Sequence, residues 1–182
     1  MAEIQMRIRY SPMWGSHLPV LMALIKQTSG TVFELGSGIY STPFLHWACF
    51  EARRELITFE ADKEWAEALI SFHGQQHRDR RFHHFVAVAD WDTVDLSGDC
   101  NVALVDHDVA ERRYKEVLKL THADFVIAHD AGDRAAEQGY DKIGDAFRYK
   151  FCYRRAYPNT AILSNSNDPR EYINPRYLRE GV

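Results

Sequence analysis

The stretch VFELGSGIYSTPFLHW, Val32 to Trp47, decides how the rest of the chain is interpreted. An apolar pair leads into Glu34, two glycines flank a serine, and a helical pattern follows. Gly36 and Gly38 lack Cβ atoms, so the backbone can turn sharply between them and a ligand can approach closely. A carboxylate and two glycines at the point where a strand passes into a helix indicate a ligand-binding loop.

The loop does not have the pattern of a phosphate-binding loop. GSGIYSTP has neither a G-K-[ST] ending nor the spacing G-x-G-x-x-G. Glu34, two residues before the first glycine, would repel a pyrophosphate but suits a ligand that carries an ammonium group. The loop therefore favours a nucleoside that bears an amino acid over a dinucleotide.

Strands and helices alternate through most of the chain. Short apolar segments predict strands at residues 31–35, 55–61, 82–90, 101–106 and 123–130. Helical spacing predicts helices between them, one of which begins at Thr42 as its cap with Pro43 in the first turn. Such alternation indicates an α/β fold with a doubly wound, mostly parallel sheet that has helices on both faces.

The C-terminal part has a less regular pattern. For residues 134–158 we expect a helix and then an edge strand, with a last strand at residues 159–165 and a tail that wraps the surface. No linker or repeat divides the chain, so residues 1–182 are expected to form a single domain.

Composition limits the class of protein. The chain has 182 residues, is 46% hydrophobic, and carries a net charge of −4, which argues against a general nucleic-acid binder. The three cysteines are far apart and show no C-x-x-C spacing, a pattern typical of intracellular proteins. No apolar run is long enough to cross a membrane, and we expect a soluble cytoplasmic protein without membrane contact.

Acidic residues follow the predicted strands. Glu60 ends the second strand, where it can accept both hydroxyls of a ribose. Asp90 and Trp91 follow the third strand and could border an adenine, and Asp106 ends the fourth. Four acids at four successive strand ends, beginning with Glu34, are more informative together than any one of them.

This order of motifs resembles the class I S-adenosylmethionine-dependent methyltransferases over residues 15–130 and the last strand. The resemblance implies S-adenosylmethionine as the cofactor, with its methionine part in the glycine loop, its ribose on Glu60, and its adenine beside Asp90 and Trp91. The cofactor-binding residues that it implies are Glu34, Gly36, Ser37, Gly38, Tyr40, Ser41, Thr42, Glu60, Ala61, Asp90, Trp91 and Asp106.

The fourth and fifth strands end in candidates for the chemistry. Asp106, His129 and Asp130 should face one crevice, and metal-dependent O-methyltransferases, which the chain also resembles, hold Mg²⁺ at such positions. His129 is an unusual ligand for Mg²⁺, which prefers oxygen, and His129 could instead be a general base. His129 and Asp130 could also simply hold the loop, and His17 is an alternative base.

The expected function is methyl transfer to a small-molecule acceptor, on a hydroxyl oxygen. The sequence lacks an N-P-P-Y-type tetrapeptide after the fourth strand, which again makes a nucleic-acid acceptor less favoured. Two alternatives remain: a nucleoside-binding module without methyl transfer, and a transferase of the aminopropyl type with the same donor site. A homodimer is possible.

Overall fold

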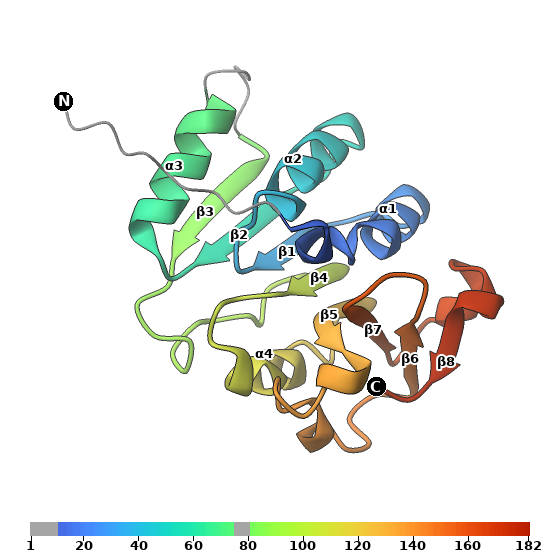
Figure 1. Ribbon diagram of the computed structural model, residues 1–182. Helices are drawn as coiled ribbons and strands as arrows, with labels where there is room; N and C mark the ends of the chain where they lie inside the picture. The colour runs from blue at the N-terminus through green and yellow to red at the C-terminus, as the bar shows by residue number, and fades with distance from the viewer. Residues whose placement is uncertain (1–10, 75–80) are drawn as a thin grey trace.

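The computed structural model describes residues 11–74 and 81–182. Its centre is one eight-stranded sheet in the order β3-β2-β1-β4-β5-β7-β6-β8 (Figure 1). The strands are β1 (Val32–Leu35), β2 (Leu56–Glu60), β3 (His83–Ala87), β4 (Val102–Val105), β5 (Phe125–Ala131), β6 (Tyr149–Tyr153), β7 (Asn159–Ser164) and β8 (Leu178–Glu180).

The directions of the strands confirm the doubly wound, mostly parallel sheet. β3, β2, β1, β4 and β5 are parallel neighbours, whereas β7 runs antiparallel to both β5 and β6. β1 has β2 on one side and β4 on the other, so the strand order changes direction there. Ligands of doubly wound sheets bind at this switch point, outside the carboxyl ends of the strands.

Two apolar cores lie on opposite faces of the sheet. In β4, Val102 and Leu104 pack with buried residues of α1 (Leu18–Gln27) and α2 (Ser41–Glu51). Ala103 and Val105 pack on the other face with Val117 of α4 (Arg113–Lys119). Successive side chains of a strand point to opposite faces and both faces of β4 are covered, which explains why all four residues of β4 are apolar. Figure 1 shows α1 and α2 on one side of the sheet, α4 on the other, and α3 (Lys63–Gly74) beside β3.

The expectation for residues 134–158 is wrong in two respects. The segment contains short 3₁₀ turns, such as η4 (Tyr140–Lys142), where a helix was expected. Gly139 and Gly144 adopt positive φ, which interrupts a regular helix after only a few residues. β6 is also not the edge strand, because the C-terminal tail adds β8 outside it.

The start of α2 differs from the expectation as well. The helix begins at Ser41, with Tyr40 in the cap position, one residue before the expected cap Thr42. The Thr42 hydroxyl turns back into the glycine loop, where it accepts a hydrogen bond from the Gly38 N–H at 2.9 Å. Thr42 therefore stabilises the loop more than the helix.

No helix in the described ranges is long and apolar enough to cross a membrane.

Candidate functional site

Gly36 brings the glycine loop against the end of β4. Its φ is +92°, and a Cβ on this residue would lie 2.4 Å from the Cα of His107 and 2.5 Å from its backbone N. The sharp turn expected from the sequence is present. The space that the missing side chain leaves, however, is filled by the chain's own backbone rather than by an approach for a ligand. Gly36 is therefore a requirement of the fold at this position.

Glu34 is fully buried beneath the loop. Its two carboxylate oxygens accept hydrogen bonds from the hydroxyls of Thr42 at 2.9 Å and Thr58 at 2.7 Å. Burial raises the pKa of Glu34 to about 7, against the smaller opposing effect of the hydroxyl donors. The Glu34 side chain is thus enclosed by hydroxyl groups of β2 and α2, and it supports the loop from below.

Glu60 ties the loop to the end of β2. One of its oxygens accepts hydrogen bonds from both the backbone N–H and the hydroxyl of Ser37, each at 2.7 Å. The other oxygen accepts the Asp62 N–H at 2.8 Å. The Trp65 indole N–H donates to the Ser37 carbonyl at 3.0 Å, so the neighbouring α3 fixes the same loop. Glu60 is 8% exposed and lies at the carboxyl end of β2 beside the glycine loop.

Asp90 and Trp91, which were predicted to bind the cofactor, differ in exposure. Asp90 is exposed and accepts the Asp92 N–H in a turn. Trp91 is buried, and its ring stacks on His107 with centroids 4.3 Å apart. Trp91 therefore belongs to the core beneath the loop after β3, whereas Asp90 is open to solvent.

The other residues predicted to bind the cofactor lie at the start of α2 and just after β2. Ser41 is buried, and Ala61 is exposed. Tyr40 lies against Gly15 of the N-terminal turn η1 (Pro12–Gly15), where a Cβ on the glycine would be 3.2 Å from the tyrosine ring. The N-terminal turn is consequently a direct neighbour of the glycine loop.

Asp106, His129 and Asp130 are brought together, as expected for the ends of neighbouring strands. The Asp106 Oδ1 is 3.0 Å from Nδ1 of His129 and 3.0 Å from Nη1 of Arg113. Burial alone would raise the pKa of Asp106, but the positive charges of His129 and Arg113 outweigh it and lower the pKa to about 2. Asp106 is therefore a fixed negative charge.

His129 bridges β5 to the N-terminal segment. Its Nε2 is 2.8 Å from the Ser16 hydroxyl, which itself donates to the Pro158 carbonyl at 2.7 Å. Because the only hydroxyl proton of Ser16 goes to Pro158, His129 must donate from Nε2, and its Nδ1 faces a carboxylate. Burial opposes a charged ring, yet Asp106 raises the pKa of His129. The hydrogen bonds thus favour the imidazolium form.

A β-bulge aims the side chain of Asp130. The register of β5 against β7 shifts between Ala128 and Ala131, and Asp130 has a φ of +59°. Its two oxygens lie 3.3 Å from Nη1 of Arg113 and 3.0 Å from Nη1 of Arg134. Two guanidinium groups therefore hold the Asp130 carboxylate.

This arrangement does not fit Mg²⁺ at Asp106, His129 and Asp130. Mg²⁺ needs oxygen ligands in near-octahedral geometry, whereas both oxygens of Asp130 are engaged by arginines and His129 offers only nitrogen. A cation bound to Asp130 would also lie beside the guanidinium groups of both Arg113 and Arg134.

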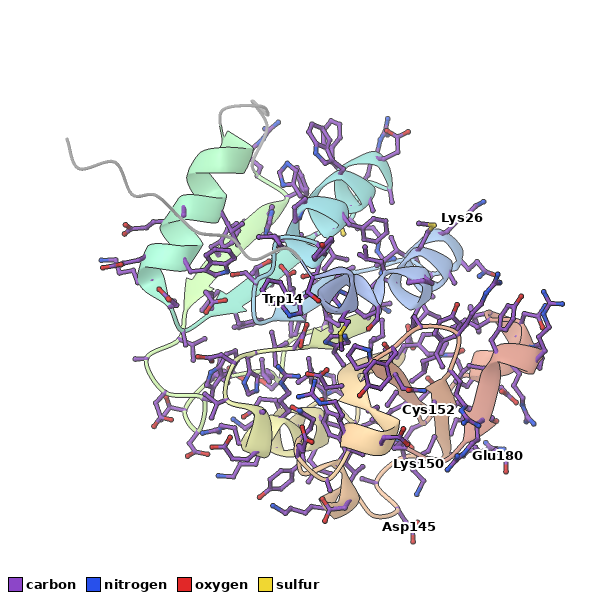
Figure 2. The ribbon with its side chains drawn as sticks, viewed as in Figure 1. Trp14, Lys26, Asp145, Lys150, Cys152 and Glu180 are labelled. Carbon is purple, nitrogen blue, oxygen red and sulfur yellow. The ribbon has the colours of Figure 1, made fainter. Side chains whose placement is uncertain are left out.

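A cleft of about 330 Å³ opens over these groups. It is lined by Ser11, Met13, Trp14, Asp106, Arg113, His129, Asp130, Arg134 and Pro158. Met13 and Trp14 are 42% and 48% exposed, and Figure 2 shows Trp14 near the start of α1. The N-terminal turn thus forms one wall, and the ends of β4 and β5 form the floor.

Sequence patterns missed several residues that build this floor. Arg113 is buried and also donates from Nε to the His107 carbonyl at 2.6 Å. The Tyr140 hydroxyl donates to the His129 carbonyl at 3.0 Å, so this tyrosine supports β5. Neither residue has a local signal, because its partner lies on another strand or beyond a loop.

Solved structures give the fold a broader context. The chain is similar to cofactor-bound Rv0187 from MTB, with 17% identity, a TM-score of 0.60, and coverage of 88% of this chain and 84% of that chain. It is also similar to an O-methyltransferase from Bacillus cereus in complex with SAH, with 15% identity, a TM-score of 0.58, and coverage of 85% and 82%.

A third similar structure is an RNA methyltransferase from Salinibacter ruber in complex with S-adenosyl-L-homocysteine, with 14% identity, a TM-score of 0.54, and coverage of 85% and 91%. No protein-family model matches the chain, and no curated protein matches it by sequence. The sheet order and these likenesses show that the chain has the Rossmann-like fold of S-adenosylmethionine-dependent methyltransferases.

Proposed function

We propose that the protein is an S-adenosylmethionine-dependent methyltransferase that acts on a hydroxyl oxygen of a small molecule. The observation that carries the proposal is that the glycine loop and the charged cleft lie next to each other at the carboxyl ends of the strands. Gly36 contacts the backbone of residues 106–107, and Asp106 lines the cleft. The methyl group of a donor bound on the loop would therefore lie beside the residues that line the cleft for the acceptor.

The donor half of the proposal rests on the loop and on Glu60. Oε1 of Glu60 accepts only the Asp62 N–H among the described residues, which leaves room for a ribose hydroxyl. The methionine part would follow residues 36–38 toward the end of β4. When bound, S-adenosylmethionine supplies an electrophilic methyl group, and the protein contributes mainly by aligning donor and acceptor.

The acceptor half rests on the size and charge of the cleft. Its volume of about 330 Å³ suits a small molecule rather than a folded macromolecule. A hydroxyl acceptor must also lose its proton, and the cleft offers Asp106, His129 and Asp130 as candidates for this step. In the imidazolium form, His129 can accept a proton only after one of its two ring nitrogens has released the proton that it carries.

Donor binding is the first test. Calorimetry with S-adenosylhomocysteine should show binding by the wild-type protein, and Glu60→Ala should weaken it by about 1–3 kcal/mol because buried hydroxyls would be left unpaired. Asp62→Asn is the matched control, since asparagine can still cap α3 and accept the Trp65 N–H at this position. Equal affinities in wild type and Glu60→Ala would remove Glu60 from the donor site.

A donor-binding module without methyl transfer is the second candidate. It is favoured by the hydrogen bonds of His129, both of whose ring nitrogens are engaged. Transfer from labelled donor to a pool of small hydroxylated molecules separates the two candidates. In an active enzyme, His129→Ala or Asp130→Ala should lower turnover by about 10²–10⁴-fold and leave donor affinity unchanged. Donor binding without transfer to any acceptor in the pool would favour the module.

A further inference from the structure

His17 is a buried histidine whose ring is not satisfied. It immediately precedes α1, is 1% exposed, and neither of its ring nitrogens has a hydrogen-bond partner among the described residues. An unpaired buried polar group is unfavourable and rare in folded proteins, so such a group calls for an explanation. Burial lowers the pKa of His17 to about 4, and the ring is neutral near pH 7.

The ring faces two residues of the charged cleft. Its Nδ1 is 3.9 Å from Oδ2 of Asp106, and its centroid is 4.7 Å from that of His129 in an edge-on contact. Arg113 and His129 both contact Oδ1 of Asp106, which leaves Oδ2 directed at His17. The unpaired groups on the two side chains thus point toward one another.

We propose that His17, Asp106 and His129 bind a divalent transition-metal ion of the Zn²⁺ class. One ligand atom from each residue lies within 4.8 Å of the other two. Two imidazoles and one carboxylate match the ligand sets that favour such ions over Mg²⁺. The site does not depend on methyl transfer and uses His17 in place of Asp130.

Small side-chain rotations complete the site. Metal–ligand bonds of about 2.0–2.2 Å require the three atoms to approach each other more closely than they do here. His129 must release its Nδ1 proton to solvent while Nε2 keeps its proton for Ser16, so the metal ion replaces the Nδ1 proton as the positive charge beside Asp106. Arg113 stays on Oδ1 as a group that orients the carboxylate, and its charge is partly balanced by Asp130 at 3.3 Å.

The position of the site suggests what the metal would face. Asp106 and His129 line the cleft, whereas His17 lies behind them. Three protein ligands leave at least one coordination position, and the cleft is the side from which a water molecule or an oxygen-bearing ligand can reach it.

The test is a titration of the metal-free, full-length protein with Co²⁺, followed by visible absorption. One equivalent should bind and give the bands of nitrogen and oxygen coordination, without the charge-transfer band of thiolate ligands. His17→Gln and Asp106→Asn should each weaken binding at least tenfold. Asp130→Asn should weaken metal binding much less than His17→Gln does, because Asp130 only balances the charge of Arg113 and asparagine also adopts positive φ readily.

Two controls distinguish the proposed site from other modes of binding. His84→Gln removes an exposed histidine and should not alter Co²⁺ binding, and circular dichroism checks the fold of every variant. If the His17 variant does not fold, pulsed electron paramagnetic resonance of Cu²⁺-loaded wild type should still count two coordinated imidazoles. Absence of stoichiometric Co²⁺ binding, full binding by a folded His17→Gln, or loss of binding in Asp130→Asn would each overturn the proposal.

Discussion

A buried carboxylate, Glu34, and a half-buried one, Asp106, lie on neighbouring strands and have opposite properties. Glu34 of β1 receives hydrogen bonds from neutral hydroxyls, and burial raises its pKa to about 7. Asp106, directly after β4, is paired with Arg113 and His129, which lower its pKa to about 2 despite burial. The partners of a buried acid, more than its depth, decide whether it is charged.

The residues around the switch point form two groups, which we name the donor edge and the acceptor edge after their proposed roles. The donor edge, formed by Glu34, Glu60 and the glycine loop, is held by hydroxyl and backbone N–H donors. The acceptor edge, formed by Asp106, Arg113, His129 and Asp130, is an ion-pair network open to a cleft. Perturbed pKa values beside a cleft are typical of reaction sites, which supports the proposal that an acceptor reacts at this edge.

The largest expected effect is the loss of the arginine that holds the acceptor edge. Arg113→Met removes the buried guanidinium that Asp106 and Asp130 share, leaves Asp106 paired with His129 alone, and should lower the free energy of unfolding by about 3–5 kcal/mol. Arg134→Met is the matched control, because Arg134 is 36% exposed and its ion pairs should contribute less than about 1 kcal/mol. Urea denaturation in the presence of chelator measures both, and similar small losses would mean that the network does not support the fold.

A smaller effect is expected where the donor loop meets β4. Gly36→Ala places a Cβ against the His107 backbone in a positive-φ conformation and should cost about 2–4 kcal/mol in stability from strain and overpacking. Gly38→Ala should cost less than about 1 kcal/mol, because Gly38 lacks a positive φ and a Cβ would meet only the Ser41 hydroxyl, at 3.1 Å. Thermal unfolding compares the pair, and the reverse order would show that the loop packs differently.

The pH dependence of stability tests the two carboxylates directly. The pKa of Glu34 is higher in the folded state, so the folded protein retains a proton between pH 4.5 and about 7 that the unfolded chain releases. Stability from this residue therefore falls as the pH rises through that window, by on the order of 3 kcal/mol. Asp106 contributes stability above pH 3.8 that is lost only as the pH falls through about 2, outside this window.

Glu34→Gln should remove this part of the pH dependence. As the pH rises from about 5 to about 8, wild type should lose the stability that the Glu34 proton provides, whereas Glu34→Gln should not. The variant should therefore become more stable relative to wild type over this range. Glu64→Gln, an exposed carboxylate on α3, controls for the loss of one acid. A constant difference between Glu34→Gln and wild type would show that Glu34 ionises normally.

The sequence predicted the parts of the molecule that depend on local patterns. Alternating apolar segments gave the five parallel strands, and the rule that ligands bind at carboxyl ends brought Asp106, His129 and Asp130 together correctly. Hydrophobic periodicity alone locates the ends of the strands. The positions of these three residues could therefore be predicted without knowledge of tertiary contacts.

Other features depend on contacts between distant segments and could not be predicted. The stacking of Trp91 on His107, and the role of Arg113 between Asp106 and Asp130, join residues of different loops and strands. β8 pairs with β6 although it is only three residues long, and its sequence has no strand pattern. Such interactions are decided by the packed fold and leave no periodic signal.

The smallest predicted effects compare one serine from each edge. Ser16 is 5% exposed and connects His129 to the Pro158 carbonyl, so Ser16→Ala leaves two buried groups without a partner and should cost about 1–2 kcal/mol in stability. Ser37 donates from its hydroxyl to Glu60, but its backbone N–H donates to the same oxygen. Ser37→Ala keeps that second bond and should cost less than about 1 kcal/mol. Urea denaturation of both variants at one pH tests the comparison. If Ser37→Ala lost more stability than Ser16→Ala, the comparison would be reversed. The donor edge would then depend more on a single hydroxyl contact than the acceptor edge does.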